Sequence, residues 1–240
     1  MTESGRPTLQ ARWLGTVPYR DAWALQQELA RQRRDDEIGD QLLLLEHPPV
    51  YTMGRAGDPA HLGAGPAALR AAGAEYIDVD RGGSVTFHGP GQLVAYPILK
   101  LRDIFPIPGH LAHGDVVAYV RALEEAVIIT AAREGIHAER RPSFTGVWVG
   151  SAKLAAIGVK VAGGVTLHGL ALNACTDLSW FERVTPCGID DATATSFSAL
   201  GVDATPRGLA TLLATDLAAV FDRRLVRSRS DEPTRRPAAA

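Results

Sequence analysis

The hydrophobic positions of this 240-residue chain follow two periods, and the helical period covers three segments. Residues 18–34 begin with Pro18 in the first turn and offer Trp23, Leu25 and Leu29 for burial. Residues 115–134 carry apolar side chains at helical spacing: Val116, Val120, Leu123 and Val127. Thr205-Pro206 is typical of a helix start, and this last helix is predicted to run to about Arg224.

Shorter apolar runs between these helices predict strands. They cover residues 41–46, 50–53, 75–80, 84–88, 92–98, 146–149, 153–161 and 165–173. Ala162-Gly163-Gly164 reads as a hairpin turn, and 54–73 as a loop with one short helix. Strands occur both in runs and between helices, which favours an α/β (α+β) fold with a mixed sheet over a doubly wound parallel one.

Both ends of the chain lack this periodicity. Residues 1–8 are polar, and 227–240 combine arginine, serine and proline without apolar spacing. We therefore expect flexible termini at 1–8 and 227–240 around a single domain over 9–226.

Composition excludes several classes of protein. The net charge of −2 gives no global attraction to nucleic acid, and no apolar run is long enough to span a membrane. The first residues have no apolar signal region, and two cysteines cannot form a disulfide framework. We therefore expect a cytoplasmic protein without metal or cofactor, and a monomer, since no coiled coil or long apolar edge calls for assembly.

Arg81 to Gln92 is the densest motif, with four glycines and one proline in twelve residues. Such a segment allows close backbone approach to a ligand, with Arg81 and His88 as polar groups at its ends. A hairpin that needs its glycines is the alternative. The segment lacks the Gly-Lys-Ser/Thr ending of a phosphate loop, and a strand follows it where a dinucleotide fingerprint needs a helix.

Lys153 and His168 are polar residues in otherwise small, apolar strands. Only three of 25 basic residues are lysines, so Lys153 stands out in a chain that otherwise uses arginine. Unlike arginine, lysine can lose its proton in a suitable environment, which makes Lys153 a candidate for a lowered pKa. His168, followed by Gly169, fits either a structural histidine or a site residue.

Cys187 lies between Pro186 and Gly188, turn-forming residues that keep a thiol uncrowded. A free cysteine is usually a small buried hydrophobe, and Cys175 fits that description better. A nearby cation would be required to turn Cys187 into a thiolate near neutral pH. We therefore interpret Cys187 and Lys153 as a pair for acyl transfer.

Five motifs in order make the chain resemble the lipoyl(octanoyl) transferase family. They are Leu-Leu-Leu-Glu-His-Pro at 43–48, Arg-Gly-Gly-Ser-Val-Thr-Phe-His-Gly-Pro-Gly-Gln at 81–92, Lys-Leu-Ala-Ala-Ile-Gly at 153–158, Leu-His-Gly-Leu-Ala-Leu-Asn at 167–173 and Pro-Cys-Gly-Ile at 186–189. The resemblance spans about Leu14 to Phe221. It implies a biotin/lipoyl protein ligase-like domain, with a mixed sheet and a smaller second sheet flanked by helices.

The resemblance also implies a reaction. Cys187 would take an octanoyl group from octanoyl-acyl carrier protein as a thioester, with Lys153 as its partner. The acceptor would be the target lysine of apo lipoyl domains in 2-oxoacid dehydrogenase complexes or of the glycine cleavage H protein. The substrate-binding residues carried over are Arg81, Gly82, Gly83, Ser84, Val85, Thr86, Phe87, His88, Ala156, Ile157, Gly158, His168, Gly169, Leu170 and Ala171.

Three other functions remain open at this point. An ATP-dependent lipoate or biotin ligase of the same fold shares the lysine but needs no cysteine. A cysteine hydrolase could use His168 as its base, although no protease pattern surrounds Cys187. A non-catalytic binding domain could use the glycine-rich segment alone.

Overall fold

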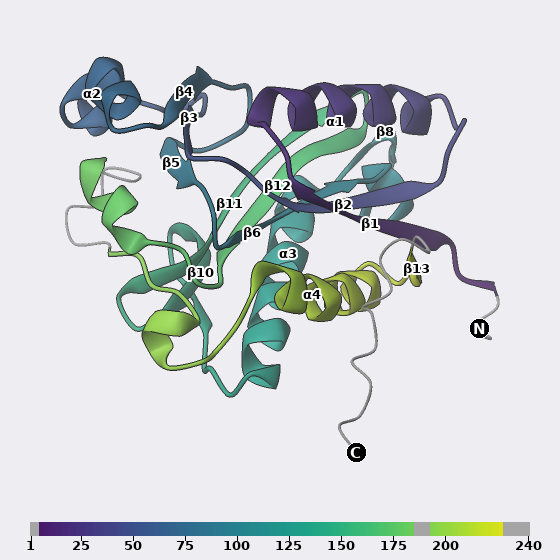
Figure 1. Cartoon of the computed structure of the whole chain (residues 1–240). Helices are drawn as coiled ribbons and strands as arrows, with labels where there is room; N and C mark the ends of the chain where they lie inside the picture. The colour runs from purple at the N-terminus through teal and green to yellow at the C-terminus, as the bar shows by residue number, and fades with distance from the viewer. Residues whose placement is uncertain (1–4, 185–192, 228–240) are drawn as a thin grey trace.

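The computed structural model describes residues 5–184 and 193–227, which form a layered α/β structure (Figure 1). In these residues the main sheet has eight strands in the order β13-β1-β2-β6-β12-β11-β10-β9. Their bounds are β1 Thr8–Thr16, β2 Asp40–Glu46, β6 Gln92–Ile98, β9 Glu139–Arg141, β10 Phe144–Val149, β11 Ala152–Ala162, β12 Val165–Asn173 and β13 Arg224–Arg227. β1 is parallel to β13 and β2, and the other pairs are antiparallel, which confirms the predicted mixed sheet.

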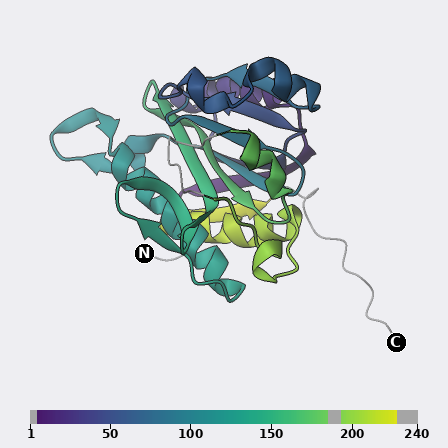
Figure 2. The same ribbon diagram turned by 90° about the vertical axis from the view of Figure 1, so that its left-hand side faces the viewer.

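Helices cover both faces of this sheet, as the two views show (Figures 1 and 2). α1 (Tyr19–Arg34) covers one face, while α3 (Val116–Arg133) and α4 (Pro206–Val220) cover the other. The run of leucines in β2 serves both layers, because successive side chains of a strand point to opposite faces. Leu42 and Leu44 pack on the side of α3 and α4, and Leu43 and Leu45 on the side of α1.

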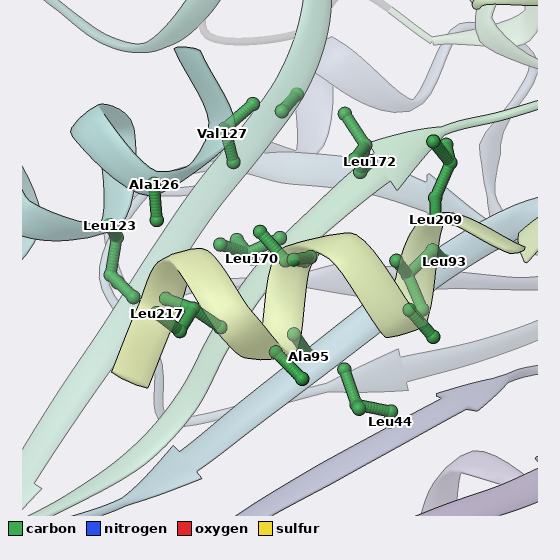
Figure 3. Close-up of a cluster of buried hydrophobic side chains, with 14 of the residues drawn as sticks. Leu44, Leu93, Ala95, Leu123, Ala126, Val127, Leu170, Leu172, Leu209 and Leu217 are labelled. Carbon is green, nitrogen blue, oxygen red and sulfur yellow. The ribbon is translucent and has the colours of Figure 1, made fainter. Parts of the chain in front are cut away.

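The core beneath α4 shows how this packing works (Figure 3). Leu209 and Leu217 point from α4 toward the sheet, where they meet Leu44, Leu93 and Ala95. All five side chains are buried. This apolar layer fixes the sheet on which the candidate site is built.

A small second sheet follows β2 in the chain, as predicted. It has the order β4-β3-β5, with β3 Val50–Met53, β4 Glu75–Asp78 and β5 Val85–His88. Between β3 and β4 the chain forms η2 (Pro59–Leu62) and α2 (Gly65–Ala71), where the sequence indicated a loop with one short helix. The remaining short elements are η3 Leu101–Asp103, β7 Pro106–Ile107, β8 His110–Gly114, η4 Leu178–Arg183 and η6 Ser198–Leu200.

The hairpin between β11 and β12 confirms the turn predicted at 162–164. Ala162 pairs with Val165, so Gly163 and Gly164 form a two-residue loop. Both have a positive φ, 57° and 77°, which this tight turn requires and glycine adopts without strain.

The predictions at the chain ends need correction. Thr8, expected in a flexible terminus, begins β1. The last helix ends at Val220, not near Arg224, because Asp222 takes a positive φ of 51° and turns the chain into β13. Arg227, expected to begin the flexible tail, is the last residue of β13. No helix among the described residues is both long and apolar enough to cross a membrane.

Candidate active site

A pocket of about 470 Å³ lies between β11, β12 and the glycine-rich segment 81–88. The Gly82 amide donates a hydrogen bond to the Val159 carbonyl, at 2.9 Å, so this segment crosses over β11. A Cβ atom on Gly158 would lie 2.9 Å from both the Gly82 oxygen and Arg81 Cδ. Glycine at 158 therefore allows the segment to lie directly on the strand.

The structure brings most of the predicted substrate-binding residues to this pocket. Fourteen of the fifteen line it, together with Lys153: Arg81, Gly82, Gly83, Ser84, Val85, Thr86, His88, Ala156, Ile157, Gly158, His168, Gly169, Leu170 and Ala171. Phe87 does not line it. Its ring is fully buried beside the small sheet and stacks on Trp180 at a centroid distance of 5.1 Å.

Arg81 holds the glycine-rich segment in place. Its Nη1 donates to the carbonyls of Gly82 and Ser84, at 3.0 and 2.9 Å. Its Nη2 donates to the carbonyl and hydroxyl oxygens of Thr52, at 2.8 and 2.7 Å. These bonds join the segment to the small sheet.

Lys153 lies near the start of β11 and lines the pocket. Its backbone N–H donates to the Thr193 carbonyl at 2.8 Å, and its carbonyl accepts from the Thr195 N–H at 2.9 Å. Its Nζ lies 4.7 Å from the centre of the Trp148 ring. A Cβ on Gly146 would lie 2.7 Å from the Ala155 carbonyl oxygen, so glycine there lets β10 lie close to β11 beside the lysine.

Cys187 lies outside the described residues, but both flanks of its segment reach the pocket. Before it, Phe181 lines the pocket and Val184 is buried. After it, Thr193 lines the pocket and bonds to Lys153.

His168 is hydrogen-bonded through both ring nitrogens. Nε2 lies 2.9 Å from Asp80 Oδ1, so this N–H donates and Nδ1 accepts from the Tyr19 hydroxyl at 3.3 Å. Burial lowers the pKa of His168, and the hydrogen bond to Asp80 opposes that shift. Asp80 also binds Lys160. His168 has a positive φ of 56°, an unusual conformation for a non-glycine residue.

Several polar residues in or beside the pocket were missed by sequence reasoning. Among them are Tyr19, His47, Gln92, Tyr96 and Asn173. Gln92 and Asn173 stand at the ends of two motifs quoted for the resemblance, so their positions could have marked them. His47 lies in a third such motif, 43–48, and meets Tyr96 because β2 and β6 are neighbours, whereas Tyr19 reaches them only through the packing of α1 on the sheet.

His47 illustrates this buried group. Its Nδ1–H donates to the Val17 carbonyl at 2.7 Å, so Nε2 accepts from the Tyr96 hydroxyl at 2.8 Å. Burial lowers the pKa of His47 to about 4, and the bond to Val17 opposes the shift. The imidazole is therefore neutral near pH 7.

Residues 18–218 match the model of the lipoyl protein ligase A/B catalytic domain. The chain belongs to this family. An octanoyltransferase of Rubrobacter xylanophilus is 53% identical over 197 residues, covering 81% of this chain and 85% of its own. One of Chloroflexus aggregans is 50% identical over 228 residues, covering 93% and 99%. The resemblance drawn from the sequence is thereby confirmed.

A solved structure of this family supports the fold. Lipoate-protein ligase A bound with ATP has a TM-score of 0.71 and 15% identity, covering 93% of this chain and 90% of the ligase chain. The predicted lipoyl ligase-like architecture is therefore confirmed. At this identity the likeness shows fold alone, so it does not separate a ligase from a transferase.

Proposed function

We propose that this protein transfers an octanoyl group from octanoyl-acyl carrier protein to the target lysine of a lipoyl domain, through a thioester on Cys187. The observation that supports this proposal most is that about half of the aligned residues are identical to those of octanoyltransferases, over most of both chains. The acceptors are apo lipoyl domains of 2-oxoacid dehydrogenase complexes and the glycine cleavage H protein. A cytoplasmic, monomeric enzyme is part of the proposal.

Two acyl transfers complete the reaction. In the first, the Cys187 thiolate attacks the donor carbonyl, a new carbon–sulfur bond forms and the carbon–sulfur bond to the carrier breaks. The carrier thiol leaves with the proton that Lys153 gives up. In the second, the acceptor amine attacks the Cys187 thioester, the carbon–nitrogen bond forms and the Cys187 thiolate leaves. Lys153 takes the proton that the amine loses. Each step exchanges one acyl bond for another, so no ATP is consumed.

The pocket has the length and lining that an acyl chain requires. Lys153 and Gly158 are five positions apart on β11, which is about 16 Å at 3.3 Å per residue. An extended octanoyl chain is about 10 Å long, given carbon–carbon bonds near 1.5 Å. Ala156, Ile157 and Leu170 provide apolar surface beside it. At about 0.8 kcal/mol per buried methylene, the chain would contribute several kcal/mol of binding.

The surroundings of Lys153 support its role. A cationic amine near Cys187 favours the thiolate, and each unit by which the thiol pKa falls corresponds to about 1.4 kcal/mol. The segment after Cys187 is bonded to the Lys153 backbone. That bonding places one end of the cysteine segment beside the lysine.

Intact mass spectrometry tests the thioester. After incubation with octanoyl-acyl carrier protein, we expect a mass increase of one octanoyl group, absent in Cys187→Ser. Full transfer by Cys187→Ala would overturn the proposal. Cys175→Ser is the matched control, because it removes the other cysteine and should keep the adduct.

Two further reactions separate the rivals. Product that forms only with ATP and free octanoate would identify a ligase. Release of free octanoate without an acceptor, at the rate of transfer, would identify a hydrolase. We expect transfer without ATP and much slower release.

A further inference from the structure

The pairing between β11 and β12 opens beside Lys153. The last paired residues at this end are Ala155 and Leu172. Beyond them Thr193–Thr195 takes the place next to β11, with backbone bonds to Lys153 on one side. On the other side, Asn173 Nδ2 donates to the Thr195 carbonyl at 2.9 Å. The segment that follows Cys187 in the chain is thus held between Lys153 and Asn173.

Asn173 is the last member of a chain of hydrogen bonds that begins at Arg81. Arg81 Nη2 donates to Thr52 Oγ1 at 2.7 Å, and Thr52 Oγ1 lies 3.4 Å from His88 Nε2. His88 Nδ1 lies 2.8 Å from Gln92 Oε1. Gln92 Nε2 donates to Asn173 Oδ1 at 2.9 Å, and Asn173 Nδ2 to Thr195. The chain joins the glycine-rich segment to the residues beside Lys153.

Two backbone carbonyls set the direction of this chain, since a carbonyl oxygen can only accept. Thr195 O fixes the Asn173 amide, and Phe87 O, 3.3 Å from Gln92 Nε2, fixes that of Gln92. Gln92 Oε1 must then accept from His88 Nδ1–H. His88 Nε2 is left to accept from the Thr52 hydroxyl. Burial lowers the pKa of His88 well below its ordinary value, so the imidazole is neutral and keeps this tautomer.

The members of the chain are withdrawn from water. His88, Gln92 and Asn173 are 7%, 1% and 4% exposed, and Thr195 is 7% exposed. A buried donor or acceptor that loses its partner has no bulk water to replace it. Each bond therefore restricts the next, and the Asn173 amide has little freedom to turn.

We propose that Asn173, oriented by Gln92, is a positioning residue for acyl transfer, because it holds Thr193–Thr195, the first described residues after Cys187, against Lys153. The proposal rests on the proposed function of Cys187 and Lys153. Asn173 acts through its bond to Thr195, not through contact with the reacting atoms.

Asn173→Asp tests this role with almost no change of shape. The variant places a carboxylate oxygen, an acceptor, where Nδ2 donates to Thr195 O. We expect kcat to fall by about 10²-fold, the usual cost when reacting groups are displaced by about 1 Å. KM for both substrates should stay within about threefold of wild type.

The pH profile gives a readout specific to the lost donor. A protonated carboxyl can donate to Thr195 O, so the ratio of variant to wild-type kcat should rise as the pH is lowered. Asn173→Ala has no such proton, and its ratio should stay constant. A constant ratio for Asn173→Asp would overturn the proposal, as would full kcat in that variant.

Alkylation of Cys187 provides a test that needs no acyl carrier. In a Cys175→Ser background we expect Asn173→Asp to react more slowly with iodoacetamide near neutral pH, with its rate profile shifted to higher pH. A profile equal to that of the background would count against the positioning role. If wild type alkylates normally but never forms an octanoyl adduct, the proposed function fails while the positioning result stands.

Gln41→Glu is the matched control. Gln41 is also buried, and its Nε2 donates to a backbone carbonyl, that of Gly39, at 3.1 Å. The Gln41→Glu variant also replaces an amide by a carboxylate, but at a residue that does not line the pocket. If Gln41→Glu lost as much kcat as Asn173→Asp, the loss would come from general destabilisation by a buried carboxylate. That result would overturn the proposal.

Discussion

Lys153 combines a fixed backbone with a side chain beside an aromatic ring. Its N–H and C=O bond to Thr193 and Thr195, and its amine faces the ring of Trp148. The residue type and its position near a strand start were evident in the sequence. The contacts were not, because they join β10, β11 and a segment forty residues further along the chain.

Replacement of Lys153 by methionine tests the amine while it keeps much of the side-chain volume. We expect octanoyl transfer by Lys153→Met to fall by about 10² to 10⁴-fold, the usual contribution of a general acid–base group. The measurement is the single-turnover rate of Cys187 acylation and of transfer. Lys100→Met is the control, since Lys100 bonds to Asp36 and does not line the pocket. Equal rates in Lys153→Met and wild type would remove the lysine from the mechanism.

The fifteen residues carried over by resemblance illustrate what a motif can predict. Most are backbone-dominated positions on one loop and two neighbouring strands, so a local pattern is enough to place them together. Phe87 differs because its ring packs into the apolar cluster beside the small sheet, stacked on Trp180. Tyr19 was missed because its place depends on where α1 packs, which no local pattern specifies. His47 lies in a quoted motif, but its partner Tyr96 lies on another strand.

Strands β6 and β12 approach closely where the floor of the pocket is formed. A Cβ on Gly169 would lie 2.1 Å from the Ala95 carbonyl oxygen. Hydrophobic periodicity predicted both strands, yet it could not show that their backbones require glycine at this point. The close approach is a property of the paired elements, not of either strand.

Gly169→Ala should therefore push β12 away from β6. We expect a loss of about 1 to 3 kcal/mol in the free energy of unfolding, the usual cost of an overpacked core. Urea denaturation followed by circular dichroism measures it. Gly39→Ala is the matched control, because the nearest atom to its Cβ is Thr8 Oγ1 at 3.8 Å. Similar stability of both variants would mean that the strands can separate without cost.

Five strands among the described residues were not predicted, the short β7, β8 and β9 and the two edge-side strands β1 and β13. β1 alternates the apolar Leu9, Ala11 and Trp13 with the polar Gln10 and Arg12, and β13 is only four residues long. β1 pairs with both β13 and β2, and β13 pairs with β1, so these two strands are stabilised by their neighbours in the sheet. The alternation in β1 could have been recognised as a strand, whereas four residues of β13 are too few for periodicity to detect.

Three histidines in or near the pocket are buried in the folded protein. Burial lowers the pKa values of His47, His88 and His168, so folding favours their neutral forms. In the unfolded chain they take up protons near pH 6.5. Below that pH the unfolded state binds more protons, so stability present at pH 7 is lost as the pH falls toward the folded pKa values.

His47 offers the clearest test of this linkage. With a folded pKa of about 4, it should contribute a loss of about 3 kcal/mol between pH 6.5 and pH 4. In His47→Gln the amide can still donate to Val17 O and accept from Tyr96, so the free energy of unfolding should vary less with pH. Urea unfolding at pH 7 and pH 4.5 compares them, with exposed His137→Gln as control. An unchanged pH dependence in His47→Gln would contradict the assignment.

The parallel pair of β1 and β13 has a consequence for how the chain reaches this structure. Thr8 pairs with Arg224, more than two hundred positions away. During synthesis β1 therefore cannot pair with β13 until nearly all of the described chain has been made. Contacts that distant form slowly, because the closure entropy of a long loop comes first. Until then a nascent chain exposes one edge of β1, and an open strand edge invites pairing with other chains. This edge is therefore where we expect aggregation during synthesis to begin.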